Sequence, residues 1–192
     1  MLKAILSEGD NFFNFFADST KGTIWEDLNH IWFRVYSLQS SLEELESYLP
    51  CCEKDYIDSN KIEKRAVERV FQLLNDQFVD CNRALARLDL VQDVDSPQDL
   101  NGNVAASETF GIVYLLGVIE GGTYRGFVNG LDAFSDLVSV RNWIVHWEWT
   151  RSNDIIVYQS VQRIFRVGRK YIEDVIGFLK RFSLEHFFKH YS

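Results

Sequence analysis

The sequence predicts an all-α protein, built as an up-and-down bundle of long antiparallel helices. Apolar residues recur at the three- and four-residue spacing of amphipathic helices over long stretches, and only 2 of the 192 residues are proline. The hydrophobic fraction of 46% is large enough to form a core, and the length suits one domain. We therefore expect residues 1–192 to form a single helical domain.

Two long helices are predicted in the first half of the chain. Apolar positions between residues 23 and 49 share one face, and Pro50 ends that segment. The same spacing recurs over residues 57–91, which predicts an antiparallel partner. The apolar positions that we assign to the buried face of the second helix are Ile62, Ala66, Val70, Leu73, Leu74, Phe78, Cys81, Leu85 and Leu88.

An acidic stretch rich in turn-forming residues separates this pair from the second half of the chain. Residues 92–107 read QDVDSPQDLNGNVAAS and have no apolar period, so we expect an irregular loop there. Helix should return at about Glu108, with Ser107 as its N-cap, and run toward Glu120. The pair Gly121-Gly122 should break or bend it.

Two more helical segments are expected before the end of the chain. One leads from about residue 124 or 132 through His146. After the polar run 150–154, apolar residues from Ile155 to Phe182 line one side of a final long helix, whose cations lie on its other faces.

Charge is unevenly placed along the chain. The net charge is -8, but residues 151–192 hold 8 Lys and Arg against 4 Asp and Glu, so this segment is positive and the preceding body is strongly negative. An acidic body repels phosphate at long range, so any contact with nucleic acid must use a local basic surface. A general DNA-coating role is therefore disfavoured.

The cysteines and the apolar segments indicate a cytoplasmic protein. Cys51, Cys52 and Cys81 form neither an even disulfide framework nor a paired zinc-binding pattern, which favours a reducing compartment. The N-terminal segment is a poor signal peptide, and we find no uncharged apolar stretch long enough to span a membrane. We expect no metal, no cofactor and no membrane partner.

Polar residues gather on one stripe of the segment 136–149, which reads DLVSVRNWIVHWEW. If this segment is helical, Ser139, Asn142 and His146 align at spacings of three and four residues, opposite an apolar stripe. The long side chain of Arg141 can bend toward the same side. This pattern predicts a polar groove.

Arg141 and His146 stand with four residues between them, Asn142 follows the arginine, and the other intervening positions are apolar. This pattern resembles the RxxxxH motif of the HEPN superfamily. The resemblance implies a HEPN-like, homodimeric helical bundle that acts as a metal-independent endoribonuclease. It further implies a bacterial toxin, as in toxin–antitoxin systems, or an antiviral defence protein. RNA would be the substrate, and an antitoxin or a neighbouring defence protein a further partner.

The chemistry expected of such a site needs few protein groups, because RNA supplies its own nucleophile, the 2′-hydroxyl. His146 would act as general base or acid, and Arg141 would bind the phosphate with its planar fork. Asn142 would hold the imidazole ring or the phosphate by hydrogen bonds. A 2′,3′-cyclic phosphate is the expected product.

Asp136, Ser139 and Glu148 are possible supporting residues. Glu148 stands where HEPN toxins paired with nucleotidyltransferase antitoxins commonly carry a modifiable tyrosine, so the same control is not expected here. A structural interpretation also exists, in which Arg141 forms an ion pair with Asp136 or Glu148 and His146 is a core or interface histidine.

RNA contact is also assigned to cations of the final helix, with a plain solvated face as the alternative. These cations are Arg163, Arg166, Arg169 and Lys170. For the whole chain, the alternative function is a non-catalytic HEPN-like module that binds RNA, a nucleotide or a protein partner. A purely structural bundle is a third interpretation.

Overall fold

The computed structural model describes residues 24–88, 108–115, 117–119, 140–141 and 151–191, and every regular element among them is a helix. These helices are α2 (Ile24–Tyr48), α3 (Glu53–Asp58), α4 (Lys61–Arg87), α5 (Glu108–Leu115) and α8 (Arg151–Tyr191). No strand occurs in this described part of the chain. The prediction of an all-α bundle is confirmed.

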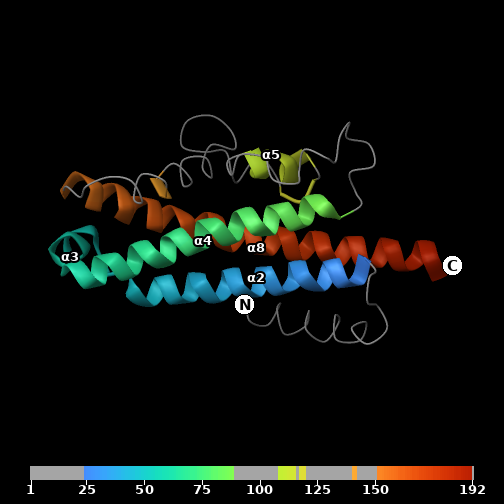
Figure 1. The fold of residues 1–192 in the computed structure, drawn as a ribbon, viewed down its shortest axis with the longest axis horizontal. Helices are drawn as coiled ribbons and strands as arrows, with labels where there is room; N and C mark the ends of the chain where they lie inside the picture. The colour runs from blue at the N-terminus through green and yellow to red at the C-terminus, as the bar shows by residue number, and fades with distance from the viewer. Residues whose placement is uncertain (1–23, 89–107, 116, 120–139, 142–150, 192) are drawn as a thin grey trace.

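Three long helices lie alongside one another and carry the bundle. Helix α2 packs against both α4 and α8, and it runs in the opposite direction to these two (Figure 1). The short helix α3 packs against α8, and α5 packs against α4. The polypeptide thus reverses direction between α2 and α4, as the sequence predicted for this pair.

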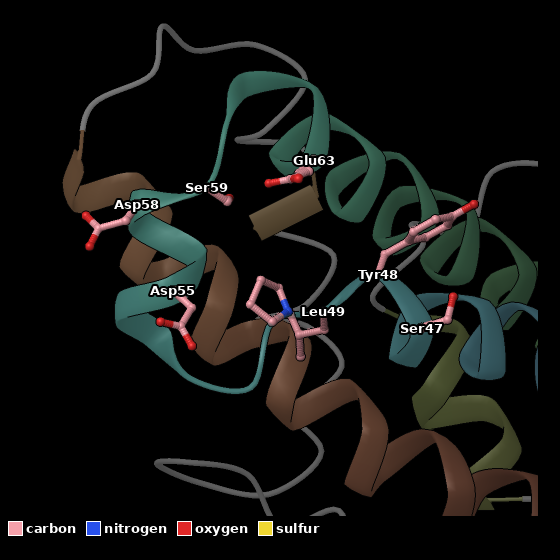
Figure 2. Close-up of a pocket in the computed structure, with 8 residues that line it drawn as sticks. Ser47, Tyr48, Leu49, Asp55, Asp58, Ser59 and Glu63 are labelled. Carbon is pink, nitrogen blue, oxygen red and sulfur yellow. The ribbon is translucent and has the colours of Figure 1, made fainter.

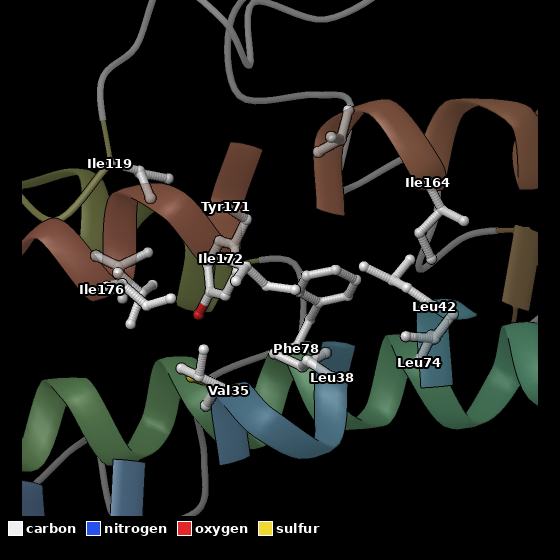
Figure 3. Packing of buried hydrophobic residues seen from close by; sticks show 14 of the residues in the cluster. Val35, Leu38, Leu42, Leu74, Phe78, Ile119, Ile164, Tyr171, Ile172 and Ile176 are labelled. Atoms are coloured by element: carbon white, nitrogen blue, oxygen red, sulfur yellow. The ribbon is translucent and has the colours of Figure 1, made fainter. Parts of the chain in front are cut away.

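The core lies between the apolar faces of the three long helices. The ring of Phe78 of α4 lies between Leu42 of α2 and Tyr171 of α8 (Figure 3). Phe78 also meets Tyr171 of α8 edge to face, with 5.0 Å between the ring centroids. Fully buried side chains of the core include Leu28, Val35, Leu38, Leu45, Phe71, Leu74, Val161, Ile172 and Leu179.

The predicted helix 57–91 is wrong at its beginning, because the chain forms two helices there. α3 ends at Asp58, and α4 begins at Lys61 with Asn60 as its N-cap. The Asn60 side chain accepts hydrogen bonds from the backbone N–H groups of Ile62 and Glu63, at 2.9 and 3.0 Å. The Glu63 carboxylate accepts the Asn60 backbone N–H in return, which completes a capping box. These bonds stabilise a new helix start in place of one continuous helix.

Two residues that we assigned to the core face of α4 are exposed. Ile62 is 81% exposed and Leu73 is 41% exposed. The buried stripe of α4 is defined by Val67, Phe71 and Phe78 and their neighbours, and both misassigned residues lie more than about 100° around the helix from it. Both residues are close to the apolar spacing of the buried stripe, and for this reason the prediction placed them on the buried face of α4 although they lie on its exposed side.

Helix α5 begins at Glu108 as predicted, but it ends at Leu115 instead of running toward Glu120. Gly117 has a φ of 68°, and its N–H donates to the Tyr114 carbonyl at 2.9 Å, while the Val118 N–H donates to the Val113 carbonyl at 3.0 Å. This pair of bonds is a Schellman motif, which needs a left-handed residue and therefore favours glycine.

The final helix α8 is confirmed, and it is longer than predicted. It begins at Arg151, so most of the polar run 150–154 is helical, and it continues to Tyr191. The reason is tertiary: Asp154 is buried and forms an ion pair with Lys64 of α4. No helix in the described residues is long and apolar enough to cross a membrane. The predicted loop 92–107 lies outside the described residues, as does the helix predicted to end at His146, except that residues 140 and 141 are helical.

Candidate functional site

Arg141 is the one residue of the predicted Arg-Asn-His site that the structure describes. Asn142 and His146 lie outside the described residues, and so do the possible supporting residues Asp136, Ser139 and Glu148. Val140, which precedes the arginine, packs partly buried against the hydrophobic core. This contact fixes the backbone beside Arg141 to the bundle.

The Arg141 guanidinium is bound by a carboxylate of α4. Its Nη2 atom lies 3.0 Å from Oδ1 and 3.3 Å from Oδ2 of Asp76. The Arg141 side chain is 31% exposed and that of Asp76 is 54% exposed, so the pair lies at the surface of the bundle. A guanidinium held in this way is restricted in orientation.

The ion-pair partner of Arg141 was missed by the sequence analysis, which considered Asp136 and Glu148. Asp76 precedes Arg141 by 65 positions and belongs to a different helix. No local spacing connects the two residues, so only the packing of the chain reveals this pair.

Two of the four cations proposed for RNA contact on α8 form ion pairs within the protein. Arg169 Nη2 donates to both carboxylate oxygens of Glu46 on α2, at 2.8 Å each, and Lys170 pairs with Asp174 one turn along α8. Arg163 and Arg166 also interact with neighbouring groups. Exposed ion pairs contribute little free energy, so these pairs would compete only weakly with phosphate for the cations. The assignment of these cations to RNA contact stays a prediction.

A buried polar cluster between α3, α4 and α8 was not predicted. Lys64 Nζ lies 2.7 Å from Asp154 Oδ2, and it also donates to the Ile57 carbonyl at 2.6 Å. Glu68 and Tyr56 are buried beside this pair. Among the described residues the Tyr56 hydroxyl has no hydrogen-bond partner.

The electrostatics of this cluster follow from burial and from the nearby carboxylates. Burial, together with the charge of Asp154, raises the pKa of Glu68 to about 7, although Arg65 and Lys64 act in the opposite direction. Burial also raises the pKa of Tyr56 far above its usual value. The sequence signal that could have revealed this cluster is Glu68 itself, because this charged residue directly follows the apolar Val67 and is close to the apolar Val70.

The described residues also form an open hollow of about 580 Å³ where the turn after α2 meets α3 and the start of α4 (Figure 2). Asp55, Asp58 and Glu63 line it, together with Ser47, Tyr48 and Leu49. No cation is among the lining residues. The hollow is therefore unsuited to bind a phosphate group.

Comparison of the chain with family models, curated proteins and solved structures finds no match.

Proposed function

We propose that the protein is a metal-independent endoribonuclease with Arg141, Asn142 and His146 at its centre, as the resemblance to HEPN ribonucleases implies. A role as a toxin or as an antiviral defence protein belongs to the same proposal. The observation that carries it is the position of Arg141 on the surface of an all-α bundle, where Asp76 orients its guanidinium.

The proposed reaction is an internal transfer at phosphorus. His146 takes the proton of the 2′-hydroxyl, the 2′ oxygen bonds to the phosphorus, and the bond from phosphorus to the 5′ oxygen breaks. A second imidazole or a water gives a proton to the 5′ oxygen, which leaves the 2′,3′-cyclic phosphate. Arg141 stabilises the charge that grows on the phosphate oxygens, and Asn142 holds the imidazole or the phosphate.

The test is cleavage of single-stranded and structured RNA by the purified chain in the presence of EDTA. His146→Ala should lower the rate by about two to four orders of magnitude, the usual contribution of general acid–base catalysis. Arg141→Lys keeps the charge but loses the planar fork, so it should lower the rate by about two orders of magnitude. Asn142→Ala should have a milder effect.

Matched variants separate these effects from general damage. His30→Ala removes an exposed histidine of α2, and Arg34→Lys changes an exposed arginine that is paired with Asp80. Both should retain the wild-type rate. Complete loss of cleavage in EDTA, or a wild-type rate in His146→Ala, would show that the proposed mechanism is wrong.

A second candidate function is a non-catalytic helical module that binds RNA, a nucleotide or a protein partner. The ion pair between Arg141 and Asp76 favours it, because an arginine bound to a carboxylate is also explained by a structural role. Expression in a host cell discriminates between the two functions. Growth arrest by the wild type that disappears in Arg141→Ala supports the enzyme. Equal growth of cells that express the wild type or Arg141→Ala supports the non-catalytic module.

A further inference from the structure

Three cations follow one another on the outer face of α4. Lys61, Arg65 and Arg69 are all exposed, and their spacing of four residues places each about 6 Å along the helix from the one before. They lie on the side of α4 opposite the buried stripe of Val67, Phe71 and their neighbours. We call these three residues the α4 basic stripe.

The α4 basic stripe differs from the cations of α8 in its surroundings. None of its three members forms an ion pair or a hydrogen bond through its side chain within the described part of the chain, whereas Arg169 and Lys170 are bound to carboxylates. Glu63, the exposed carboxylate nearest in sequence, is engaged in the capping box with Asn60. Within the described part of the chain, the stripe therefore presents three exposed cations without a direct ion pair, on a protein whose net charge is negative.

Apolar groups accompany these cations on the outer side of α4. Ile62 and Leu73 are exposed there, at 81% and 41%. A single-stranded nucleic acid exposes bases and sugars as well as phosphates, and proteins that bind it combine cations along the backbone with apolar contacts to the bases. The combination suits a single strand better than a small inorganic anion.

The stripe also leads to the candidate site. Arg69 and Asp76 are seven residues apart, which is about two helical turns, so they share one face of α4 about 10 Å apart. Asp76 binds Arg141. A strand that lies along the outer face of α4 would pass three cations and then reach the guanidinium to which we assign the reacting phosphate.

We propose that Lys61, Arg65 and Arg69 form a track for the phosphate backbone of single-stranded RNA that runs along α4 toward Arg141. The proposal rests on the proposed function, because it assigns a path to the substrate of that site. One row of cations follows one strand, whereas the two backbones of a duplex would need a second row.

The experiment measures the affinity of the full-length chain for a labelled single strand of 2′-O-methyl RNA about 12 nucleotides long. This RNA has phosphates but no nucleophilic hydroxyl, so binding is measured without cleavage. In the triple variant Lys61→Gln, Arg65→Gln, Arg69→Gln, affinity at low salt should fall by about tenfold or more. The slope of log affinity against log salt concentration should become shallower by about 2, since each lost phosphate contact contributes about 0.7.

The matched control removes three surface cations from other helices. Lys54→Gln in α3, with Lys180→Gln and Arg181→Gln in α8, makes the same change in net charge. This variant should bind within about threefold of wild type and keep the salt slope. Equal weakening in both triple variants would show that only net charge matters, and an unchanged affinity and slope in the stripe variant would refute the track.

Two further results are decisive. A wild-type chain that does not bind single-stranded RNA, or that binds duplex RNA equally well through the same three cations, overturns the proposal.

Cleavage of ordinary RNA is measured in parallel. If the wild type cleaves RNA and the triple stripe variant keeps its kcat/KM, the proposed track is wrong, but the proposed ribonuclease activity is supported. If the stripe substitutions weaken RNA binding but the wild type does not cleave RNA, the proposed catalysis is wrong and the binding track is supported.

Discussion

Gly168 of α8 lies where this helix packs closely against α2 and α4. A Cβ atom built there would lie 3.0 Å from Leu42 Cδ1 and 3.1 Å from Phe78 Cζ, both core side chains. Because these side chains are packed in the core, they have little room to move away. The glycine therefore permits the close approach of α8 to α2 and α4.

Gly168→Ala should lower the free energy of unfolding by about 1 to 3 kcal/mol, the usual cost of overpacking a core. Gly111→Ala is the control, because a Cβ atom at that helical position meets nothing within 4 Å. The control should be neutral or stabilise the protein by up to about 1 kcal/mol. Urea unfolding of both variants measures the difference, and a Gly168→Ala protein as stable as wild type would contradict this account of the packing.

Glu68 should make the stability of the protein depend on pH. Its pKa is raised from the usual value of about 4.5 to about 7 in the folded chain. The folded state therefore binds more protons than the unfolded state between these values, so this residue stabilises the fold fully below about pH 4.5 and loses its contribution as pH rises through 7. The loss is roughly 3 kcal/mol, from the free energy equivalent of a pKa shift.

Glu68→Gln keeps the shape of the side chain and cannot ionise, so this variant should lose that part of the pH dependence. At pH 8 it should unfold at a higher temperature than wild type. Glu44→Gln, a change at an exposed position of α2, is the control and should follow the wild-type profile. Parallel pH profiles for wild type and Glu68→Gln would show that the carboxyl group is not destabilised by its surroundings.

At the scale of helices, a buried hydrogen-bond network joins α4, α5 and α8. The Tyr171 hydroxyl donates to Asn82 Oδ1 at 2.6 Å, and Asn82 Nδ2 donates to Thr109 Oγ1 at 3.1 Å. All three side chains are buried. An apolar core would allow helices to slide or rotate past each other, whereas these bonds require one relative position.

Tyr171→Phe should cost about 1 to 3 kcal/mol of stability, because it removes the donor to a buried amide oxygen. Tyr158→Phe is the control. The Tyr158 hydroxyl accepts only a longer bond of 3.3 Å from Gln162, in a partly buried place, and its loss should cost less than about 1 kcal/mol. Equal stabilities of the two variants, measured by chemical denaturation, would mean that the Asn82 network contributes no specific stability.

At the scale of the whole molecule, we predict a two-fold symmetric homodimer. One copy of the Arg-Asn-His site supplies a single histidine, whereas acid–base cleavage of RNA benefits from two protonatable groups. Sedimentation at micromolar concentration should show a dimer, and the specific activity should fall on dilution as the dimer dissociates. A protein that sediments as a monomer and keeps its specific activity on dilution would contradict this assembly.

The sequence by itself determined the fold class and most of the core. The apolar spacing of the segments that became α2, α4 and α8 identified the long helices, because a helix that buries one face must repeat apolar residues with the helical period. The candidate site at Arg141 was also predicted from a local pattern, and its role stays a prediction. The sequence also contains the Asn60 and Glu63 capping box, a local signal for a helix start that the prediction of one helix over 57–91 did not take into account.

Only the tertiary structure decided which distant residues meet. Asp76 binds Arg141 across 65 positions, and Lys64 binds Asp154 across 90. The exposure of Ile62 and of the α4 basic stripe also depends on which side of α4 is covered by other helices. Helical periodicity fixes which residues share a face, but a contact between helices depends on their packing and relative rotation, and no local pattern encodes these.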